Sequence, residues 1–148
     1  MIKVLKFGGT SVGSAANMKK VAEIVRREQA RITVLSAMSG TTDSLVRISR
    51  AAASGDRNAI EEQLAMLTDK YTRCIEELLR ERKQQALARM NATFGLIRDE
   101  AAAFEEYESE RKIIAQGELL TSAIFTAYLQ ETGLKAECLY SPDFMVKD

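Results

Sequence analysis

The chain has 148 residues, the length of one ordinary globular domain that can bury a hydrophobic core. Its 46% hydrophobic and 28% charged residues are typical of a soluble globular protein and exclude an intrinsically disordered one. Lysine plus arginine balances aspartate plus glutamate at 21 each, which excludes an acidic tail and the basic field of a nucleic-acid-binding protein.

Histidine is absent, and the two cysteines, Cys74 and Cys138, lie far apart in sequence. This excludes the usual zinc motifs and any Ser–His or Cys–His catalytic pair, so no metal site is expected. A disulfide is one alternative, but two buried free thiols in a reducing cytosol are favoured. The N-terminus lacks a signal peptide and no stretch approaches the ~20 apolar residues of a membrane span, so we expect a cytoplasmic protein without a membrane partner.

The first part of the chain alternates strands and helices. Residues 2–7 are short and apolar and precede Gly8-Gly9, which predicts a buried strand ending in a tight turn. Ser14 is the expected N-cap of a helix that runs to about Glu28. Residues 31–36 predict a second buried strand.

A second helix is expected to start near Thr42 or Asp43 and to end near Ser54-Gly55. Strand, helix, strand, helix is the pattern of a parallel sheet covered by helices. Both glycine-containing turns would then lie at the carboxyl ends of strands, where open α/β sheets bind their ligands.

The next segment, about residues 57–105, predicts an antiparallel helical hairpin. Its apolar residues recur in steps of three and four along two seams, namely Ile60, Leu64, Leu67, Tyr71, Cys74 and Leu78, then Leu87, Met90, Phe94, Ile97, Ala101 and Phe104. A charged stretch at residues 80–83 joins them. We see no catalytic constellation here and interpret the charges as a solvated outer face, with a protein-binding surface as the alternative.

A further helix is expected from about Ser109 to Thr132, ending at Gly133 as a natural C′ residue. Residues 134–140 then predict a strand that Pro142 closes.

The first candidate site is the segment Lys-Phe-Gly-Gly-Thr-Ser-Val at residues 6–12. Glycines directly after a strand let the backbone approach a phosphate closely, and the following helix N-terminus adds a favourable dipole. It is not a Walker A loop, because Ser14 stands where that motif requires lysine. An ordinary strand-to-helix turn with a surface lysine is the alternative.

The second candidate is Ser-Ala-Met-Ser-Gly-Thr-Thr-Asp at residues 36–43. Small hydroxyl residues at a strand end and helix start can bind a carboxylate through O–H and N–H groups. Plain N-capping by Thr42 or Asp43 is the alternative.

The third candidate is Gln-Gly-Glu-Leu-Leu-Thr-Ser at residues 116–122. Glu118 and Ser122 are four residues apart and share a helix face, so the glutamate could receive an ammonium group. A solvated surface glutamate is the alternative.

Taken together, the three segments resemble the aspartate kinases. Residues 6–12 match the N-terminal signature of that family, and residues 36–43 and 117–122 are similar to its second and third motifs in the same order. Acetylglutamate and uridylate kinases, from the wider superfamily, keep a lysine and paired glycines but not usually the full first motif. The resemblance covers essentially the whole chain, residues 1–148. It implies an α/β fold, the N-terminal half of the amino-acid kinase parallel-sheet α/β/α sandwich, with the helical hairpin inserted.

The same resemblance implies roles for individual residues. Lys6 would be the catalytic cation that neutralises charge on the γ-phosphoryl group of ATP, while Gly8, Gly9 and Ser11 would line its oxygens. The aspartate subsite would contain three hydroxyl residues and one carboxylate for the α-ammonium group, namely Ser36, Ser39, Thr42 and Glu118. Phosphoryl transfer needs alignment and charge stabilisation more than a covalent catalyst, so this set suits the reaction.

The implied parent enzyme would use Mg²⁺-ATP and L-aspartate to make β-aspartyl phosphate, the first step of the aspartate-family pathway to lysine, threonine and methionine. Family members are longer: the rest of the catalytic domain holds the adenine pocket, and regulatory domains or a homoserine dehydrogenase follow in some. We therefore expect the chain alone to be inactive and to self-associate, consistent with a homo-oligomeric parent.

The family often has an Asp-Ala-Arg-like stretch after the last strand, where this chain has Tyr140-Ser141-Pro142, so no role is assigned there. Two other functions stay open at this point. One is a non-enzymatic anion- or protein-binding module with the hairpin as a docking arm. The other is a kinase for a different amino acid.

Overall fold

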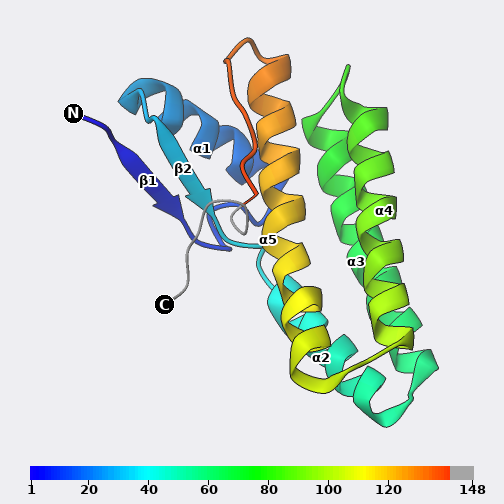
Figure 1. The fold of residues 1–148 in the computed structure, drawn as a ribbon. Coiled ribbons are helices and arrows are strands. Elements are labelled where there is room, and N and C mark those ends of the chain that lie inside the picture. The colour runs from blue at the N-terminus through cyan, green and yellow to red at the C-terminus, as the bar shows by residue number, and fades with distance from the viewer. Residues whose placement is uncertain (141–148) are drawn as a thin grey trace.

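The computed structural model describes residues 1–140 (Figure 1). Two strands and five helices follow one another in the order β1 (Val4–Phe7), α1 (Ala15–Glu28), β2 (Ile32–Leu35), α2 (Thr41–Ser54), α3 (Arg57–Leu78), α4 (Lys83–Ala102) and α5 (Glu106–Glu131). None of the described helices combines the length and the apolar character that crossing a membrane requires.

The two strands form a parallel pair, with Val4 opposite Ile32 and Phe7 opposite Leu35. Helix α1 makes the connection between them, as a parallel pair requires (Figure 1). The expected α/β architecture with a parallel sheet is therefore confirmed. Ser14 caps α1 as expected, because its side-chain oxygen accepts a hydrogen bond from the amide of Asn17 at 3.1 Å.

The prediction that both strands are buried is wrong for every second residue. Leu35 is buried, but Val4, Ile32 and Val34 are 58%, 49% and 45% exposed. Successive side chains of a strand point to opposite faces, and the described helices cover only the face that carries Leu35. The other face of the sheet thus presents a row of apolar side chains to solvent.

Helices α3 and α4 form the predicted hairpin, which stands beside α5 in Figure 1. Their antiparallel course follows from two cross-contacts: Glu61 pairs with Arg98, and the hydroxyl of Thr72 lies 3.6 Å from the sulfur of Met90. The predicted seam residues Leu64, Tyr71 and their neighbours are buried and join the core of the remaining helices. The connecting turn is fixed by α5, whose Glu131 carboxylate accepts hydrogen bonds from two of the turn's backbone amides at 2.8 and 3.0 Å.

Helix α5 begins at Glu106, three residues before the expected Ser109, and ends at Glu131, and Gly133 is its C′ residue as predicted, with a φ of +96°. The amide of Gly133 donates to the carbonyl of Gln130, and the amide of Leu134 donates to that of Leu129. This is the Schellman arrangement, in which the C′ residue adopts the left-handed conformation that suits glycine.

The strand predicted over residues 134–140 is not present. The segment has no regular secondary structure, and it is tied back to α5 by a 2.7 Å hydrogen bond from the Gln130 side chain to the carbonyl of Ala136. A strand requires a hydrogen-bonded neighbour, and the sheet of the described residues consists of β1 and β2. Pro142, the expected end of that strand, lies outside the described residues.

Both cysteines are free thiols, as favoured from the sequence, but only one of them is buried. Cys74 lies in the hairpin, where burial, reinforced by the charge of Glu77, raises the pKa of its thiol to about 11. Cys138 is exposed in the irregular segment after α5, so the prediction that it is buried is wrong.

Candidate functional site

The first two motifs meet at one edge of the sheet. Gly8-Gly9 follows β1 directly, and the second motif, residues 36–43, follows β2. Because the strands are parallel, both turns lie at their carboxyl ends, as the sequence predicted. The amide of Ser36 donates to the carbonyl of Phe7 at 3.1 Å, which extends the pairing of the two strands up to the turns.

Gly9 brings the backbones of the first two motifs into close contact. A Cβ atom at this position would lie 2.8 Å from the carbonyl oxygen of Ala37, so a side chain would force the two segments apart. The carbonyl of Gly9 also accepts a hydrogen bond from the amide of Ser39 at 3.1 Å. The predicted phosphate-binding and aspartate-binding turns are therefore direct neighbours.

Gly117 plays the same part between the second and third motifs. A Cβ atom here would lie 3.0 Å from the Cβ of Ala37 and 3.1 Å from a methyl carbon of Thr41. Helix α5 can thus approach the second motif closely only because position 117 lacks a side chain. Glu118 is the next residue of α5, and its side chain is exposed.

The alternative interpretation of the second motif, simple N-capping by Thr42 or Asp43, is wrong. Helix α2 begins at Thr41, one residue earlier than expected, and its N-cap is Gly40, with a φ of +83° and no side-chain cap. A left-handed φ of this size favours glycine. The side chains of Thr42 and Asp43 are exposed and are not used to cap the helix.

The predicted phosphate-binding residues lie at the surface. Lys6 is in β1 on the exposed face of the sheet, opposite Val34 in the register. Gly8 and Ser11 are exposed, and a Cβ atom at Gly8 would meet no atom within 4 Å, so packing does not require glycine there.

The predicted aspartate-binding residues line the turn and the helix that faces it. Ser36 is half-buried, whereas Ser39, Thr42 and Glu118 are exposed. In residues 1–140 none of these four side chains, nor that of Lys6, forms a hydrogen bond or an ion pair with another protein group. Packing brings the three motifs together, while no direct contact links Lys6 to Glu118.

Sequence reasoning missed two hairpin residues that reach the second motif. The Nζ atom of Lys70 donates to the carbonyl of Ser39, and partial burial lowers the pKa of this lysine. The hydroxyl of Tyr71 lies 3.1 Å from the side-chain oxygens of both Thr41 and Thr121. One signal was present in the sequence, because a tyrosine in an otherwise apolar seam needs a polar partner for its hydroxyl.

The site offers backbone amides, hydroxyls, the ammonium groups of Lys6 and Lys70, and the carboxylates of Asp43 and Glu118. Such groups can hold an anion and a zwitterionic small molecule by hydrogen bonds and charge, but they contain no paired nucleophile and base. The described residues include no group of three or more acidic, cysteine or histidine side chains that could hold a metal ion. In kinases Mg²⁺ is bound by one or two carboxylates together with the phosphates of the nucleotide, so Mg²⁺-ATP stays an expectation and no step is assigned to the metal.

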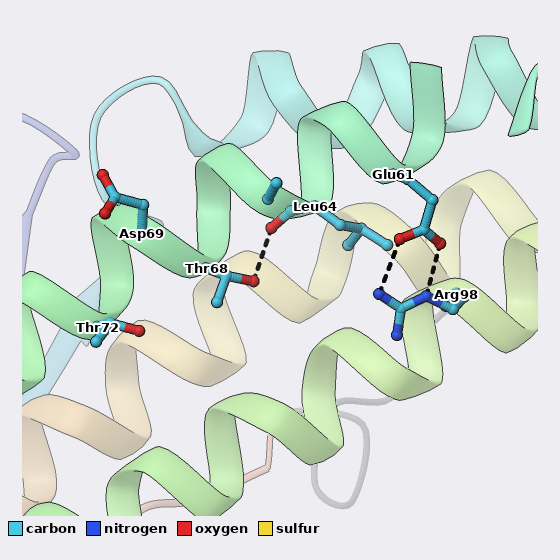
Figure 2. A pocket seen from close by; sticks show the side chains of 7 residues that line it. Glu61, Leu64, Thr68, Asp69, Thr72 and Arg98 are labelled. Atoms are coloured by element: carbon cyan, nitrogen blue, oxygen red, sulfur yellow. Dashed lines mark hydrogen bonds and ion pairs between the residues drawn. The ribbon is translucent and has the colours of Figure 1, made fainter. Parts of the chain in front are cut away.

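A separate groove lies between α3 and α4, on the outer side of the hairpin (Figure 2). Glu61 and Arg98 close one part of it through two hydrogen bonds of 2.7 and 3.1 Å. The remaining lining residues are Leu64, Ala65, Thr68, Asp69 and Thr72. None of the predicted site residues is among them, so this groove is distinct from the three motifs.

Comparisons with known proteins agree on one family. The family model of the amino acid kinases matches residues 1–146. An aspartokinase of Chlamydia muridarum is 30% identical over 98% of this chain, and the chain spans 31% of that relative's length. Crystal structures of Escherichia coli aspartokinase III superpose with TM-scores of 0.82, in complex with lysine and aspartate, and 0.79, in complex with aspartate and ADP. Their sequence identities are 25% and 26%, over 90% and 93% of this chain and 30% of theirs.

Proposed function

This chain belongs to the amino acid kinase family, and on that premise we propose that it is part of an aspartate kinase. The reaction would transfer the γ-phosphoryl group of ATP to the side-chain carboxylate of L-aspartate. A carboxylate oxygen forms the new bond to phosphorus while the bond to the β–γ bridging oxygen breaks, so that ADP leaves and β-aspartyl phosphate is formed.

One observation carries the proposal: the second motif lies packed between the first and the third. Gly9 contacts Ala37 and Ser39 from one side, and Gly117 contacts Ala37 and Thr41 from the other. A turn suited to phosphate is therefore next to hydroxyl groups suited to a carboxylate and to a glutamate suited to an ammonium group. Phosphoryl transfer to an amino acid requires these three functions side by side.

In this proposal Lys6 stabilises the negative charge that develops on the transferring group, acting as a compact cation at the sheet edge. The amides of Gly8 and Gly9 and the hydroxyl of Ser11 bind its oxygens. The exposure of Lys6, Gly8 and Ser11 is consistent with contact to a ligand.

The aspartate molecule would lie along the second motif. Ser36, Ser39 and Thr42 offer hydroxyl groups for its carboxylates, and Glu118 offers a carboxylate for its α-ammonium group. The chain spans about a third or less of the relatives described above. The nucleotide's adenine and ribose would bind elsewhere in the parent enzyme, within a catalytic domain of which residues 1–148 form one part.

Aspartate binding by the 148-residue chain tests the ligand directly. We expect heteronuclear NMR titration to give saturable shifts at the second motif and at Glu118, at lower concentrations of L-aspartate than of L-glutamate. Glu118→Gln removes the charge that pairs with the α-ammonium group and should weaken binding about tenfold or more. Glu62→Gln changes an exposed helical glutamate far from the motifs and should leave binding as it is.

The possible outcomes separate the alternatives. Saturation by a different amino acid in place of aspartate would favour a kinase for that substrate. Phosphate binding without any amino acid binding would favour a non-enzymatic anion-binding module. Aspartate shifts that Glu118→Gln leaves unchanged would contradict the proposed subsite.

A further inference from the structure

We propose that the hydroxyl of Tyr71 is a positioning group for the aspartate subsite, which it serves by joining the hairpin to the second motif and to helix α5 at once. The ligand's identity rests on the function proposed above, whereas the positioning role rests on the contacts of Tyr71. The sequence had indicated no part for the hairpin in the site, so this inference adds a residue that the three motifs do not contain.

The link consists of four groups in a row. The amide of Met38 donates to the side-chain oxygen of Thr121 at 3.3 Å, and that oxygen lies 3.1 Å from the Tyr71 hydroxyl. The Tyr71 hydroxyl lies 3.1 Å from the side-chain oxygen of Thr41. Three elements separated by 30 to 83 residues in sequence are thereby connected through one hydroxyl group.

The link is closed to water. Tyr71 and Thr121 are fully buried and Thr41 is 1% exposed. Buried hydroxyls that lose a partner cannot replace it with solvent, so each group in the row depends on the others. Burial also raises the pKa of Tyr71, which keeps its hydroxyl protonated and able to donate.

Packing alone does not explain why residue 71 is a tyrosine. Its ring packs edge-on against Phe94, with 5.9 Å between the ring centroids, and a phenylalanine at position 71 would make the same contact. The hydroxyl is needed only for the polar link. A polar group that serves no packing role in a core is a candidate for fixing geometry.

The groups that the link holds are neighbours of the proposed aspartate ligands. Thr41 directly precedes Thr42, and Met38 directly precedes Ser39, so both ends of the turn are tied. Thr121 lies three residues after Glu118 on α5, close to the same helix face. Lys70, the residue before Tyr71, holds the carbonyl of Ser39 from the same helix.

The consequence is a defined spacing between the turn that carries Ser39 and Thr42 and the helix that carries Glu118. A ligand that must contact both sides gains from having that spacing set before it binds. Without the Tyr71 hydroxyl, the turn and α5 keep their apolar contacts through Gly117 and the hydrogen bond from the Met38 amide to Thr121, but they lose the connection from Thr41 through the hairpin. We expect aspartate affinity to fall about tenfold, equivalent to one buried hydrogen-bonding group.

Tyr71→Phe in the 148-residue chain is the direct test, because it deletes the hydroxyl and retains the ring. Tyr107→Phe is the matched control, the same chemical change at a side chain that is 72% exposed. Phe94→Leu is the stability control, since it weakens the packing around Tyr71 without touching the hydroxyl. We expect aspartate binding to weaken about tenfold in Tyr71→Phe and less than twofold in the two controls.

Amide hydrogen exchange of Met38 provides a readout that does not need the ligand. Exchange should be faster in Tyr71→Phe than in Phe94→Leu when both are compared under conditions where the chain is folded. If Tyr71→Phe binds aspartate as tightly as the unmodified chain, or if Met38 exchange is unchanged, the positioning role is wrong. If the unmodified chain binds no aspartate while Tyr71→Phe still speeds Met38 exchange, the ligand assignment fails and the positioning role stands.

Discussion

The helical hairpin and the two-stranded sheet bury their apolar residues to very different extents. In the hairpin, Leu64, Ile75 and Ile97 are each 1% exposed or less. In the sheet, Val4, Ile32 and Val34 retain between 45% and 58% of their exposure. Both regions were predicted from apolar patterns, yet only the hairpin encloses its apolar residues with partners from the described chain.

This difference in burial arises because the two regions need different numbers of neighbouring elements to cover their apolar residues. A pair of helices plus the helices next to it can form a closed core within a short stretch of sequence. A parallel sheet has two faces and two edges, and each needs cover or pairing from another part of the fold. The site lies where these regions meet, since the turn after β2 packs against α3 and α5 and the turn after β1 packs against that turn.

Truncation of an apolar side chain should lower the free energy of unfolding much more in the hairpin than on the open face of the sheet, and this is the largest difference we expect between the two regions. Ile75→Ala removes a fully buried side chain from the hairpin, and we expect the free energy of unfolding to fall by about 2–5 kcal/mol. Val34→Ala on the open sheet face should cost less than about 1 kcal/mol. Urea denaturation of both variants measures the contrast, and equal losses would mean that the sheet face is covered in solution.

Thiol reactivity should distinguish the closed hairpin from the irregular segment after α5. Burial raises the pKa of Cys74 from an ordinary 9.0 to about 11, which lowers its thiolate fraction about 100-fold at pH 8. A thiol reagent should therefore modify Cys138 promptly and Cys74 at least about 100-fold more slowly. Raising the pH toward 11 should speed the slow phase, and Cys138→Ser should remove the fast one. Equal modification rates of Cys74 and Cys138 in the folded chain would show that the hairpin core is accessible to solvent.

The open sheet face should promote self-association at high concentration. Val4 and Ile32 are paired in the register, and replacing both with threonine keeps the β-branched shape while exchanging a methyl group of Val4 and the ethyl group of Ile32 for hydroxyls. We expect the dissociation constant, measured by light scattering, to rise about tenfold. Met66→Thr with Leu96→Thr, at exposed hairpin positions, is the control. Monomeric behaviour of the unmodified chain would contradict the expectation.

Features set by local sequence could be predicted. The seams of the hairpin recur at helical spacing within each helix, Ser14 caps the helix that it precedes, and Gly133 ends α5 with the φ that glycine favours. Two predictions that depended on distant partners were wrong. The exposed strand face and the missing strand at residues 134–140 both reflect which other segments lie beside them, which a short window of sequence does not contain.

The candidate site likewise has some features that local sequence predicts and others that depend on contacts between distant residues. The three motifs and their order could be recognised in the sequence, and the strand ends predicted that the first two would meet. The contacts of Gly117 with Ala37, and of Tyr71 with Thr41 and Thr121, connect residues tens of positions apart and became visible only in the fold. The roles proposed for the individual side chains stay predictions.

The most direct test of the central proposal is a phosphoryl-transfer assay on the full-length protein that contains this chain. We expect ATP- and L-aspartate-dependent formation of an acyl phosphate, trapped as the hydroxamate, with most of the rate lost in Lys6→Ala and retained in Lys19→Ala, which changes an exposed lysine of α1. The 148-residue chain alone should show no activity, because the groups of such a site act as a unit. Absence of hydroxamate from the full-length protein, or formation that is independent of Lys6, would show that the proposed function is wrong.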